Sequence, residues 1–315
     1  MKIVFMGTPD FAVKTLEKLV DSNYEVGLVL TQQDKAKDRG KKIQFTPVKE
    51  FALSHNIQVL QPERLKGNEE TLDAIKEYNP DVIVVVAYGK LLPKEILELP
   101  RHGCVNVHAS LLPKLRGASP IQHAIIGGYR ETGVTIIKMS EGLDTGDMII
   151  QRAIPIGDMN FSRLHDALAV LGADLCMEAL KLLESGEASF SKQDDTLATY
   201  AGIIRKENGR IDFSDSPQQV ELKVRGYDPW PGAFCYYSPS EESEKIMMKV
   251  WKAAPIEKDS LEPCGTILET DDEGIKVSCG GKILLISELQ VPGKKRMAVK
   301  DYIKGNKIIK GRILE

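Results

Sequence analysis

The chain has 315 residues, 42% of them hydrophobic, and its 42 Lys and Arg residues nearly balance 45 Asp and Glu residues, which gives a formal charge of −3. This length predicts two domains of ordinary size, and the small net charge excludes a global field that would draw the protein to nucleic acid or to an anionic membrane. Five widely spaced cysteines without a Cys-x-x-Cys pair argue against a disulfide framework or a zinc site. No apolar run approaches the ~18 residues of a membrane span, so we expect a soluble cytoplasmic protein without a membrane partner.

The first thirty residues predict the opening of a parallel α/β sheet. A short apolar run, 2–6, reads as a strand that ends at Gly7. Thr8 and Pro9 read as the N-cap and the first residue of a helix that continues to Val20, and 26–31 reads as the second strand. The turn holds one glycine and not Gly-x-Gly-x-x-Gly, which argues against an NAD-dependent enzyme.

A long polar loop, 32–47, is predicted after the second strand. Its basic residues are Lys35, Lys37, Arg39, Lys41 and Lys42, and its acidic residues are Asp34 and Asp38. On general grounds a solvated charge run and a binding loop are about equally frequent readings of such a segment. Because the loop leaves the carboxyl end of a strand, where open α/β sheets bind ligands, we favour a binding loop.

Strands and helices continue to alternate up to about residue 183. The segment 81–87 is typical of a central strand buried on both faces. Further strands are predicted at 57–60, 104–108, 133–139 and 148–151. Helices are predicted at 69–78 and 93–97, from Pro120 to a stop at Gly127, and from a cap at Ser162 through Leu183.

The remainder of the chain has a different pattern. The polar segment 190–208 lacks periodicity and suits a linker. Beyond it, short strand-like runs at 234–237, 246–251, 265–268, 275–278 and 282–286, with short helices at 218–224 and 299–304, favour a small β-barrel. Eight basic residues and one acid lie in 294–312, and composition supports RNA binding and a soluble surface about equally. We therefore expect a domain at 1–189, a linker at 190–208 and a domain at 209–315.

One strand and one loop carry the candidate chemistry. Asn106 and His108 stand at i and i+2 on the strand 104–108 and should share a face. Asp144 lies in Gly-Leu-Asp-Thr-Gly-Asp, whose glycines allow the sharp turns that aim a carboxylate. Asn106 or His108 alone would more often be a structural residue, but together with Asp144 they supply the groups for acyl transfer to an amine. Asp144 also begins the Asp-Thr-Gly triplet of aspartic proteases, which we reject because that class needs two such carboxylates in an all-β frame.

Longer motifs around these residues make the chain similar to a known family. Residues 104–113 read Cys-Val-Asn-Val-His-Ala-Ser-Leu-Leu-Pro, and 116–123 read Arg-Gly-Ala-Ser-Pro-Ile-Gln-His. With the loop 142–147 they resemble the formyltransferases that use 10-formyltetrahydrofolate. Arg-Gly-Lys-Lys at 39–42, Pro-Trp-Pro-Gly at 229–232 and Gly-Lys-Lys-Arg-Met at 293–297 resemble the members that act on methionyl initiator tRNA. A glycinamide ribonucleotide formyltransferase would end near residue 200, without the barrel.

The resemblance implies a Rossmann-like formyltransferase domain followed by an OB-like β-barrel domain that binds tRNA. It implies formyl transfer from 10-formyltetrahydrofolate to the α-amino group of methionyl initiator tRNA. The mechanism requires no metal, and we expect a monomer. Matching motif positions imply catalytic roles for Asn106, His108 and Asp144. They imply folate contacts at Ser110, Leu111, Leu112 and Pro113, and tRNA contacts at Arg39, Lys41 and Lys42.

The basic loop departs from the usual family pattern. Gln33 stands where a proline is usual, and 35–38 read Lys-Ala-Lys-Asp in place of Arg-Pro-x-Gly. We expect a more mobile loop before tRNA binds, with the role of Arg39 unchanged. Two alternatives stay open: a related formyltransferase or hydrolase with a small-molecule acceptor, and a non-catalytic RNA-binding adaptor. The intact catalytic set argues against the adaptor, and the basic segments argue against the small-molecule acceptor.

Overall fold

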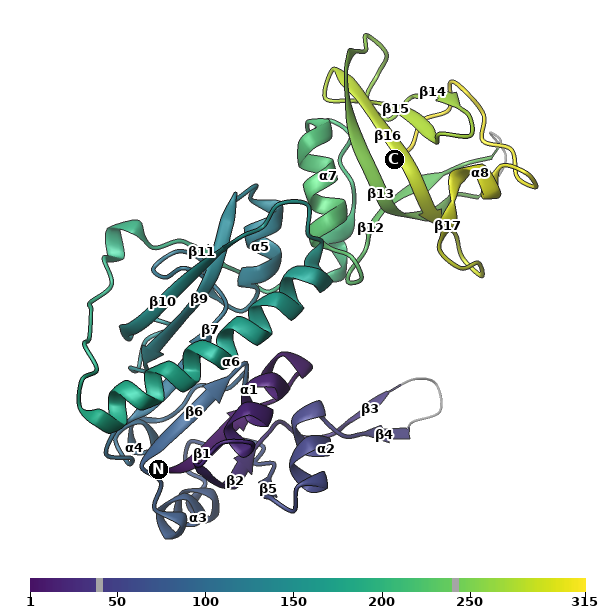
Figure 1. Ribbon diagram of the computed structural model, residues 1–315. Coiled ribbons are helices and arrows are strands. Elements are labelled where there is room, and N and C mark those ends of the chain that lie inside the picture. Colours follow the sequence, from purple (N-terminus) through teal and green to yellow (C-terminus); the bar gives the residue numbers. More distant parts are fainter. Residues whose placement is uncertain (38–41, 240–243) are drawn as a thin grey trace. The chain divides into compact units, whose positions relative to one another are not determined.

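The computed structural model describes residues 1–37, 42–239 and 244–315, and the chain forms two compact units (Figure 1). The first unit comprises Met1–Pro120, Glu131–Pro155 and His165–Gly202. The second comprises Ile121–Arg130, Ile156–Leu164 and Ile203–Glu315. The segment 190–208 is therefore divided, because its part up to Gly202 packs with the first unit.

A seven-stranded mixed sheet lies at the centre of the first unit, in the order β10-β9-β7-β6-β1-β2-β5. Its strands are β1 (Lys2–Gly7), β2 (Glu25–Leu30), β5 (Gln58–Leu60), β6 (Val82–Val86), β7 (Cys104–His108), β9 (Glu131–Lys138) and β10 (Asp147–Pro155). The first five are parallel, whereas β9 is antiparallel to both β7 and β10. All of β6 is buried, which confirms the predicted central strand. The chain order reverses beside β1, and open α/β sheets bind ligands at the carboxyl ends of strands near such a reversal.

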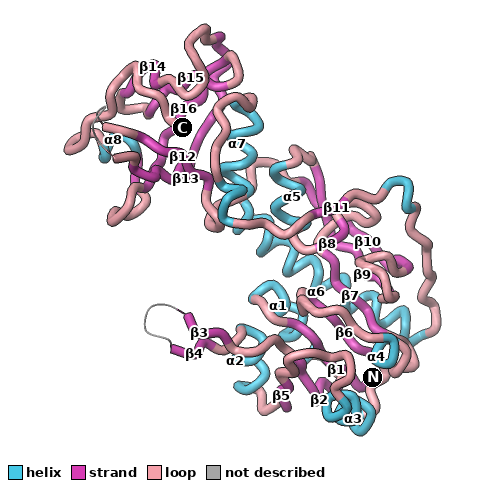
Figure 2. The backbone as a smooth tube through the Cα atoms, turned by 180° about the vertical axis from the view of Figure 1, so that it is seen from behind, coloured by secondary structure: helices cyan, strands magenta, loops and turns pink. Residues whose placement is uncertain are grey.

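Helices cover both faces of this sheet. α1 (Asp10–Val20) and α6 (Phe161–Ser185) share one face, where the rings of Phe11 and His165 meet edge-on with centroids 5.3 Å apart (Figure 1). α3 (Glu69–Tyr78) and α4 (Lys94–Leu97) lie on the other face (Figure 2), where Ile75 and Ile96 join a core cluster with residues of β1, β2 and β6. Because each fully buried aliphatic side chain contributes about 1.5–3 kcal/mol, these two layers hold the sheet in place.

Two helix starts differ from the predictions. Pro9 is the N-cap of α1 and not its first residue, and the Thr8 hydroxyl donates to the Tyr88 carbonyl at 3.2 Å instead of capping the helix. α6 begins at Phe161, and the Asn160 side chain accepts from the backbone N–H of Arg163 at 3.1 Å. Asn160, and not Ser162, therefore caps this helix, since the sequence offers two capping residues two positions apart.

Part of the predicted polar loop 32–47 has regular structure. β3 (Lys35–Lys37) pairs with β4 (Lys42–Gln44) as an antiparallel hairpin, and α2 (Pro47–Ser54) follows. The prediction of a loop without strands is wrong here, because three-residue strands are too short to give a period-two pattern in the sequence.

Polar contacts fix the base of this hairpin. The Asp34 carboxylate accepts from Lys49 Nζ at 2.5 Å and from Gln61 Nε2 at 2.8 Å. The hydroxyls of Thr31 and Thr46, which precede and follow the hairpin, are 2.8 Å apart. Burial alone would raise the pKa of Asp34, but the hydrogen bonds from Lys49 and Gln61 and the charge of Lys49 outweigh it and hold this pKa below its usual value.

Antiparallel strands form the second unit. Their order is β12-β13-β16-β15-β14, with β17 paired to β16. The elements are α5 (Pro120–Ile126, with Pro120 in the first unit), η2 (Lys206–Gly209), α7 (Pro217–Gly226), β12 (Ala233–Tyr237), β13 (Ile246–Asp259), β14 (Ile267–Thr270), β15 (Ile275–Cys279), β16 (Lys282–Gln290), β17 (Met297–Ala298) and α8 (Val299–Tyr302). Val250, Leu284 and Ile286 lie at the centre of its core and are fully buried. β13 extends well beyond the predicted strand 246–251.

The last residues of the chain connect the two outer strands of this sheet. Leu314 donates to the Gly265 carbonyl and Ile267 donates to the Arg312 carbonyl, both at 2.8 Å. Glu315 exchanges two backbone hydrogen bonds with Tyr236 of β12, at 2.8 and 3.0 Å. The strand ladders of the described residues form no closed ring by themselves, but these bonds join their edges, in keeping with the barrel-like domain that the sequence predicts.

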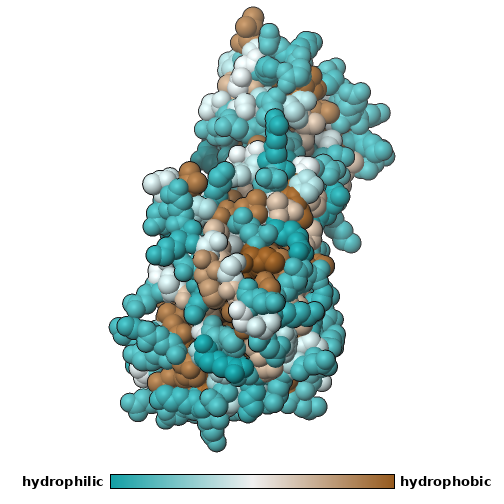
Figure 3. All heavy atoms as spheres, turned by 60° about the vertical axis from the view of Figure 1, so that its left-hand side comes forward, coloured by the Kyte–Doolittle hydropathy of each residue, from teal (hydrophilic) through white to brown (hydrophobic). Residues whose placement is uncertain are grey.

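The surface drawn in Figure 3 is mostly hydrophilic, with hydrophobic patches between the polar areas. Large apolar side chains with high exposure include Leu91, Tyr200 and Ile203. Within the described ranges, every helix is too short or too polar to cross a bilayer.

Candidate functional site

The predicted amide and imidazole lie at the carboxyl end of β7. Asn106 pairs with Val85 of β6, and His108 pairs with Thr135 of β9. Strand alternation turns Val107 to the opposite face, against Gly172 of α6. Asn106 is half-buried and His108 is buried. Their i and i+2 spacing puts both side chains on one face, and both lie near Asp144.

The loop between β9 and β10 carries Asp144. Its φ of 53° places it in the left-handed region, which costs a non-glycine residue of the order of 1–3 kcal/mol. Gly146 allows the loop to close tightly, because a Cβ there would lie 1.9 Å from the Lys138 carbonyl oxygen. β9, β10 and this close contact therefore hold the backbone of Asp144 in a conformation that the loop alone would not prefer.

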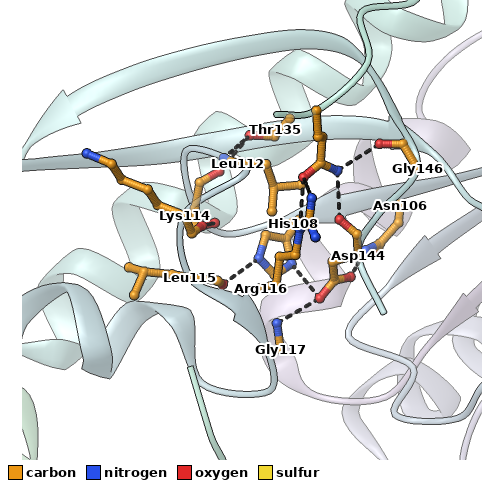
Figure 4. A network of polar contacts seen from close by, with 12 residues as sticks. Asn106, His108, Leu112, Lys114, Leu115, Arg116, Gly117, Thr135, Asp144 and Gly146 are labelled. Carbon is orange, nitrogen blue, oxygen red and sulfur yellow. Dashed lines mark hydrogen bonds and ion pairs between the residues drawn. The ribbon is translucent and has the colours of Figure 1, made fainter. Parts of the chain in front are cut away.

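Asn106, His108 and Asp144 meet in one polar network (Figure 4). Asn106 Nδ2 donates to Asp144 Oδ1 at 3.3 Å, and His108 Nδ1 lies 3.6 Å from Asp144 Oδ2. The backbone N–H of Gly117 also donates to Asp144 Oδ2, at 2.8 Å. The three residues span 38 positions of the sequence, and the structure brings them together as the sequence predicts.

The imidazole has a defined orientation. His108 Nε2 lies 3.0 Å from the Leu115 carbonyl oxygen, which can only accept, so Nε2 carries a proton. Nδ1 is then the nitrogen at which a proton can be gained or lost, and it faces Asp144. The 3.6 Å separation of Nδ1 and Oδ2 exceeds a direct hydrogen bond, which leaves the proton path between them to a bridging group or a small movement.

The predicted folate-contacting residues form a turn tied to the sheet. Ser110 is fully buried, and its hydroxyl donates to the Lys114 carbonyl at 2.6 Å. Leu112 is buried, and its carbonyl accepts from Gln151 Nε2 at 3.0 Å. Leu111 and Pro113 are half-buried and are the members of this turn with side chains open to solvent.

The predicted tRNA-contacting residues are mostly outside the structural description. Arg39 and Lys41 lie outside the described residues, and Lys42 is described only as a backbone position in β4.

In the other basic segment, 294–312, some side chains form ion pairs with carboxylates of the same unit. Arg296 donates to Glu288 at 2.7 Å and to the nearly buried Asp228 at 2.9 Å. Its charge is therefore balanced within the second unit.

Sequence reasoning missed the residues that support the Asp144 loop. Gln193 Nε2 donates to the carbonyl oxygens of Asp144, at 2.7 Å, and Gly146, at 2.8 Å. Gln193 Oε1 accepts from the Nε and Nη2 of Arg116, a buried residue of β8 (Arg116–Gly117), at 3.0 and 2.8 Å. Arg116 Nη2 also pairs with Asp195 of η1 (Asp195–Leu197) at 2.7 Å. Nothing in the sequence marks Gln193 as part of a site, because it lies in the segment predicted to be a linker.

Two kinds of chemistry are not provided at this site. Cys104 stands two residues before Asn106, but burial raises the pKa of its thiol to about 12, so it is no nucleophile near neutral pH. In the part of the chain that the structure describes, no group of three His, Cys, Asp or Glu side chains is placed to hold a metal ion.

The chain matches known proteins along its whole length. Residues 1–180 match the formyl transferase family and residues 203–307 match the formyl transferase C-terminal domain. It is 49% identical to the methionyl-tRNA formyltransferase of Caldanaerobacter subterraneus subsp. tengcongensis over 316 residues, and 49% identical to that of Clostridioides difficile over 315 residues; each match covers 100% of both chains.

Solved structures share the fold at lower identity. An N-formyltransferase from Helicobacter canadensis, in complex with folinic acid and dTDP-3-aminofucose, matches with a TM-score of 0.66 and 19% identity over 91% of this chain and 98% of its own. HypX from Aquifex aeolicus, in complex with tetrahydrofolic acid, matches with a TM-score of 0.60 and 18% identity over 99% of this chain and 50% of its own. The chain belongs to the formyl transferase family.

Proposed function

We propose that this formyl transferase family member transfers the formyl group of 10-formyltetrahydrofolate to the free α-amino group of methionyl initiator tRNA, which yields N-formylmethionyl-tRNA for translation initiation. The observation that carries the reaction is the meeting of Asn106, His108 and Asp144 at the end of β7. The acceptor follows from the named activity of relatives that match the chain from end to end.

Asn106 stabilises the oxyanion in this proposal. Attack of the unprotonated amine on the formyl carbon gives a tetrahedral intermediate with a negative oxygen. The Asn106 amide has two N–H groups, of which one donates to Asp144 Oδ1 and the second is left for this oxygen. Loss of one such donor typically lowers kcat by about 10²- to 10³-fold.

His108 and Asp144 handle the proton of the attacking amine. Because Nε2 already donates to Leu115, the amine proton passes to Nδ1 or to the Asp144 carboxylate beside it. When the tetrahedral intermediate collapses, the bond between the formyl carbon and the folate nitrogen breaks, and this nitrogen takes up the proton, so that tetrahydrofolate leaves. A carboxylate next to Nδ1 also stabilises the imidazolium cation that forms. Positioned acid–base groups of this kind typically contribute about 10²- to 10⁴-fold.

The turn 110–113 contacts the folate in this proposal. Leu111 and Pro113 supply half-buried apolar surface, while the Ser110 hydroxyl and the Leu112 carbonyl fix the turn through hydrogen bonds. In this proposal no metal is needed, because the Asn106 amide supplies the oxyanion donor and His108 and Asp144 supply the proton acceptor.

The tRNA is bound by the basic loop and the second unit. Arg39, Lys41 and Lys42 contact its acceptor end, and the basic residues of 294–312 attract its phosphates. We further propose that the protein acts as a monomer in the cytoplasm, where charged initiator tRNA is present.

The decisive experiment offers the protein 10-formyltetrahydrofolate with charged initiator tRNA, uncharged tRNA or a sugar amine. Formylated methionyl-tRNA as the preferred product supports the proposal. Transfer only to the sugar amine would favour a small-molecule formyltransferase, and no transfer at all would remove the enzymatic proposal. Arg39→Ala tests the loop: transfer to tRNA should weaken while slow hydrolysis of the folate persists, and equal loss of both activities would refute the tRNA role of the loop.

A further inference from the structure

The support of the Asp144 loop comes from two distant parts of the chain. The carboxylate is held by Asn106 and by the Gly117 backbone, whereas the loop backbone is held by Gln193. Gln193 lies 49 positions after Asp144, in the segment 190–202 that packs with the first unit. Its side-chain hydrogen bonds with the described residues go to the backbone carbonyls of Asp144 and Gly146 and to Arg116.

The geometry uses every hydrogen-bonding group of the Gln193 amide. Its two N–H groups go to the carbonyl oxygens of Asp144 and Gly146. Its oxygen accepts from two nitrogens of Arg116, which can only donate. Exchange of the amide oxygen and nitrogen would place donor against donor and acceptor against acceptor, so only one orientation fits.

Arg116 is in turn fixed by its surroundings. Its side chain is 2% exposed, and its backbone belongs to the short strand β8, which pairs with β11 (Tyr200–Ala201). The next residue, Gly117, donates its N–H to the Asp144 carboxylate. A Cβ on Gly117 would lie 2.7 Å from the Ala201 carbonyl oxygen, so the two strands approach as closely as a glycine allows. The segment 190–202 thus reaches Asp144 by two routes, through Gln193 and through β11 and Gly117.

We propose that Gln193 is a positioning residue for formyl transfer: it holds the backbone of Asp144 in its left-handed conformation and thereby sets the direction of the carboxylate toward His108. This inference rests on the proposed function, because it assumes that Asp144 acts in the reaction. It assigns to the segment 190–202 a part in catalysis beyond that of a connection between units. Gln193 supplies a donor for the carbonyl of this left-handed residue, at 2.7 Å.

Two substitutions separate positioning from packing. Gln193→Glu keeps an acceptor for Arg116 but replaces both N–H donors by an oxygen that faces the two carbonyls. Gln193→Ala removes donors and acceptor together. Ser191→Ala is the matched control, because Ser191 is exposed and pairs with Met148 only through its backbone. Melting temperatures establish that each variant is folded before its kinetics are compared.

We expect Gln193→Glu to lower kcat by roughly 10- to 100-fold, as is typical when a partner of a catalytic group is lost, with KM for both substrates within about threefold of wild type. The pH profile of kcat should shift, because the contact between Asp144 and His108 changes. Gln193→Ala should show the same kcat loss, and Ser191→Ala should match wild type. In the double variant Gln193→Glu with Asp144→Asn, kcat should be no lower than in Asp144→Asn alone.

The proposal is overturned if folded Gln193→Glu has the kcat and pH profile of wild type, or if the two losses multiply in the double variant. A folded Gln193→Glu that restores the activity lost in Gln193→Ala would also overturn it, because only the packing of Arg116 would then matter. If wild type fails to formylate methionyl-tRNA but formylates another amine, the proposed function fails, and the same variants measured with that amine still test the role of Gln193.

Discussion

Gly146→Ala tests whether close packing behind the Asp144 loop sets the rate of the reaction. A Cβ at this position would lie 1.9 Å from the Lys138 carbonyl oxygen, 2.8 Å from its carbonyl carbon and 3.2 Å from the Met139 Cα. All three atoms belong to the backbone of the neighbouring strand and its end, so no flexible side chain can turn away. The loop must therefore move by about 1.5 Å to restore an ordinary contact.

The size of the effect follows from this displacement. A misplacement of about 1 Å at a catalytic group lowers kcat by about 10²-fold, because the reacting groups are no longer aligned. The strain of the added methyl group should also lower the free energy of unfolding by about 1–3 kcal/mol. Steady-state formylation of methionyl-tRNA measures the first effect and calorimetric melting the second. KM for both substrates should change little, since no binding group is removed.

Two other glycines provide the controls. Gly186 has a φ of 76° but open space around it, so Gly186→Ala introduces backbone strain alone and should lower stability by about 1–2 kcal/mol without changing kcat. The φ of Gly202 is not positive and an added Cβ would meet open space, so Gly202→Ala should resemble wild type. A Gly146→Ala variant with wild-type kcat would refute the argument, and so would a kcat loss of equal size in Gly186→Ala.

Three further expectations concern other parts of the chain. Asn106→Ala should lower kcat by about 10²- to 10³-fold with little change in folding stability, and a loss below tenfold would contradict its oxyanion role. The pKa of Asp34 is lowered in the folded state, so its contribution to stability is present above its unfolded pKa of about 3.9 and is lost as the pH falls through the folded value. Lys49→Met should therefore make the unfolding free energy less dependent on pH in this acid range. An unchanged dependence would contradict the assignment. Leu314→Ala should destabilise the second unit by about 2–5 kcal/mol in denaturant titrations, because Leu314 is 2% exposed in its core, and a cost below 1 kcal/mol would show that the terminal residues contribute little.

Local sequence patterns predicted the elements that position the site. The apolar run of β6 and the spacing of polar and apolar residues in β7 each lie within five consecutive residues, so both can be read directly from the sequence. Asn106 and His108 could be paired from strand geometry alone. Asp144 could be located from its flanking glycines, but its conformation could not, since a positive φ at an aspartate depends on contacts from elsewhere in the chain.

The parts that sequence reasoning missed depend on contacts between distant positions. Gln193 looks like any glutamine in a polar stretch, and its role exists only because β8 and β11 bring it to the loop. The proton on His108 Nε2 is likewise fixed by the Leu115 carbonyl, and no sequence motif indicates this contact. Asn160 and Ser162 both satisfied the rule for a helix cap, and the choice between them is made by the fold.

The backbone hydrogen bonds of residues 311–315 also protect the second unit from pairing with other copies of the protein. Unpaired outer strands are templates on which other chains can build intermolecular sheets. Here one short stretch shields parts of both borders at once, through Gly265 and Ile267 on one side and Tyr236 on the other. Local fraying of this stretch would uncover both borders together, and self-association at high concentration would then begin there, before the rest of the unit had unfolded.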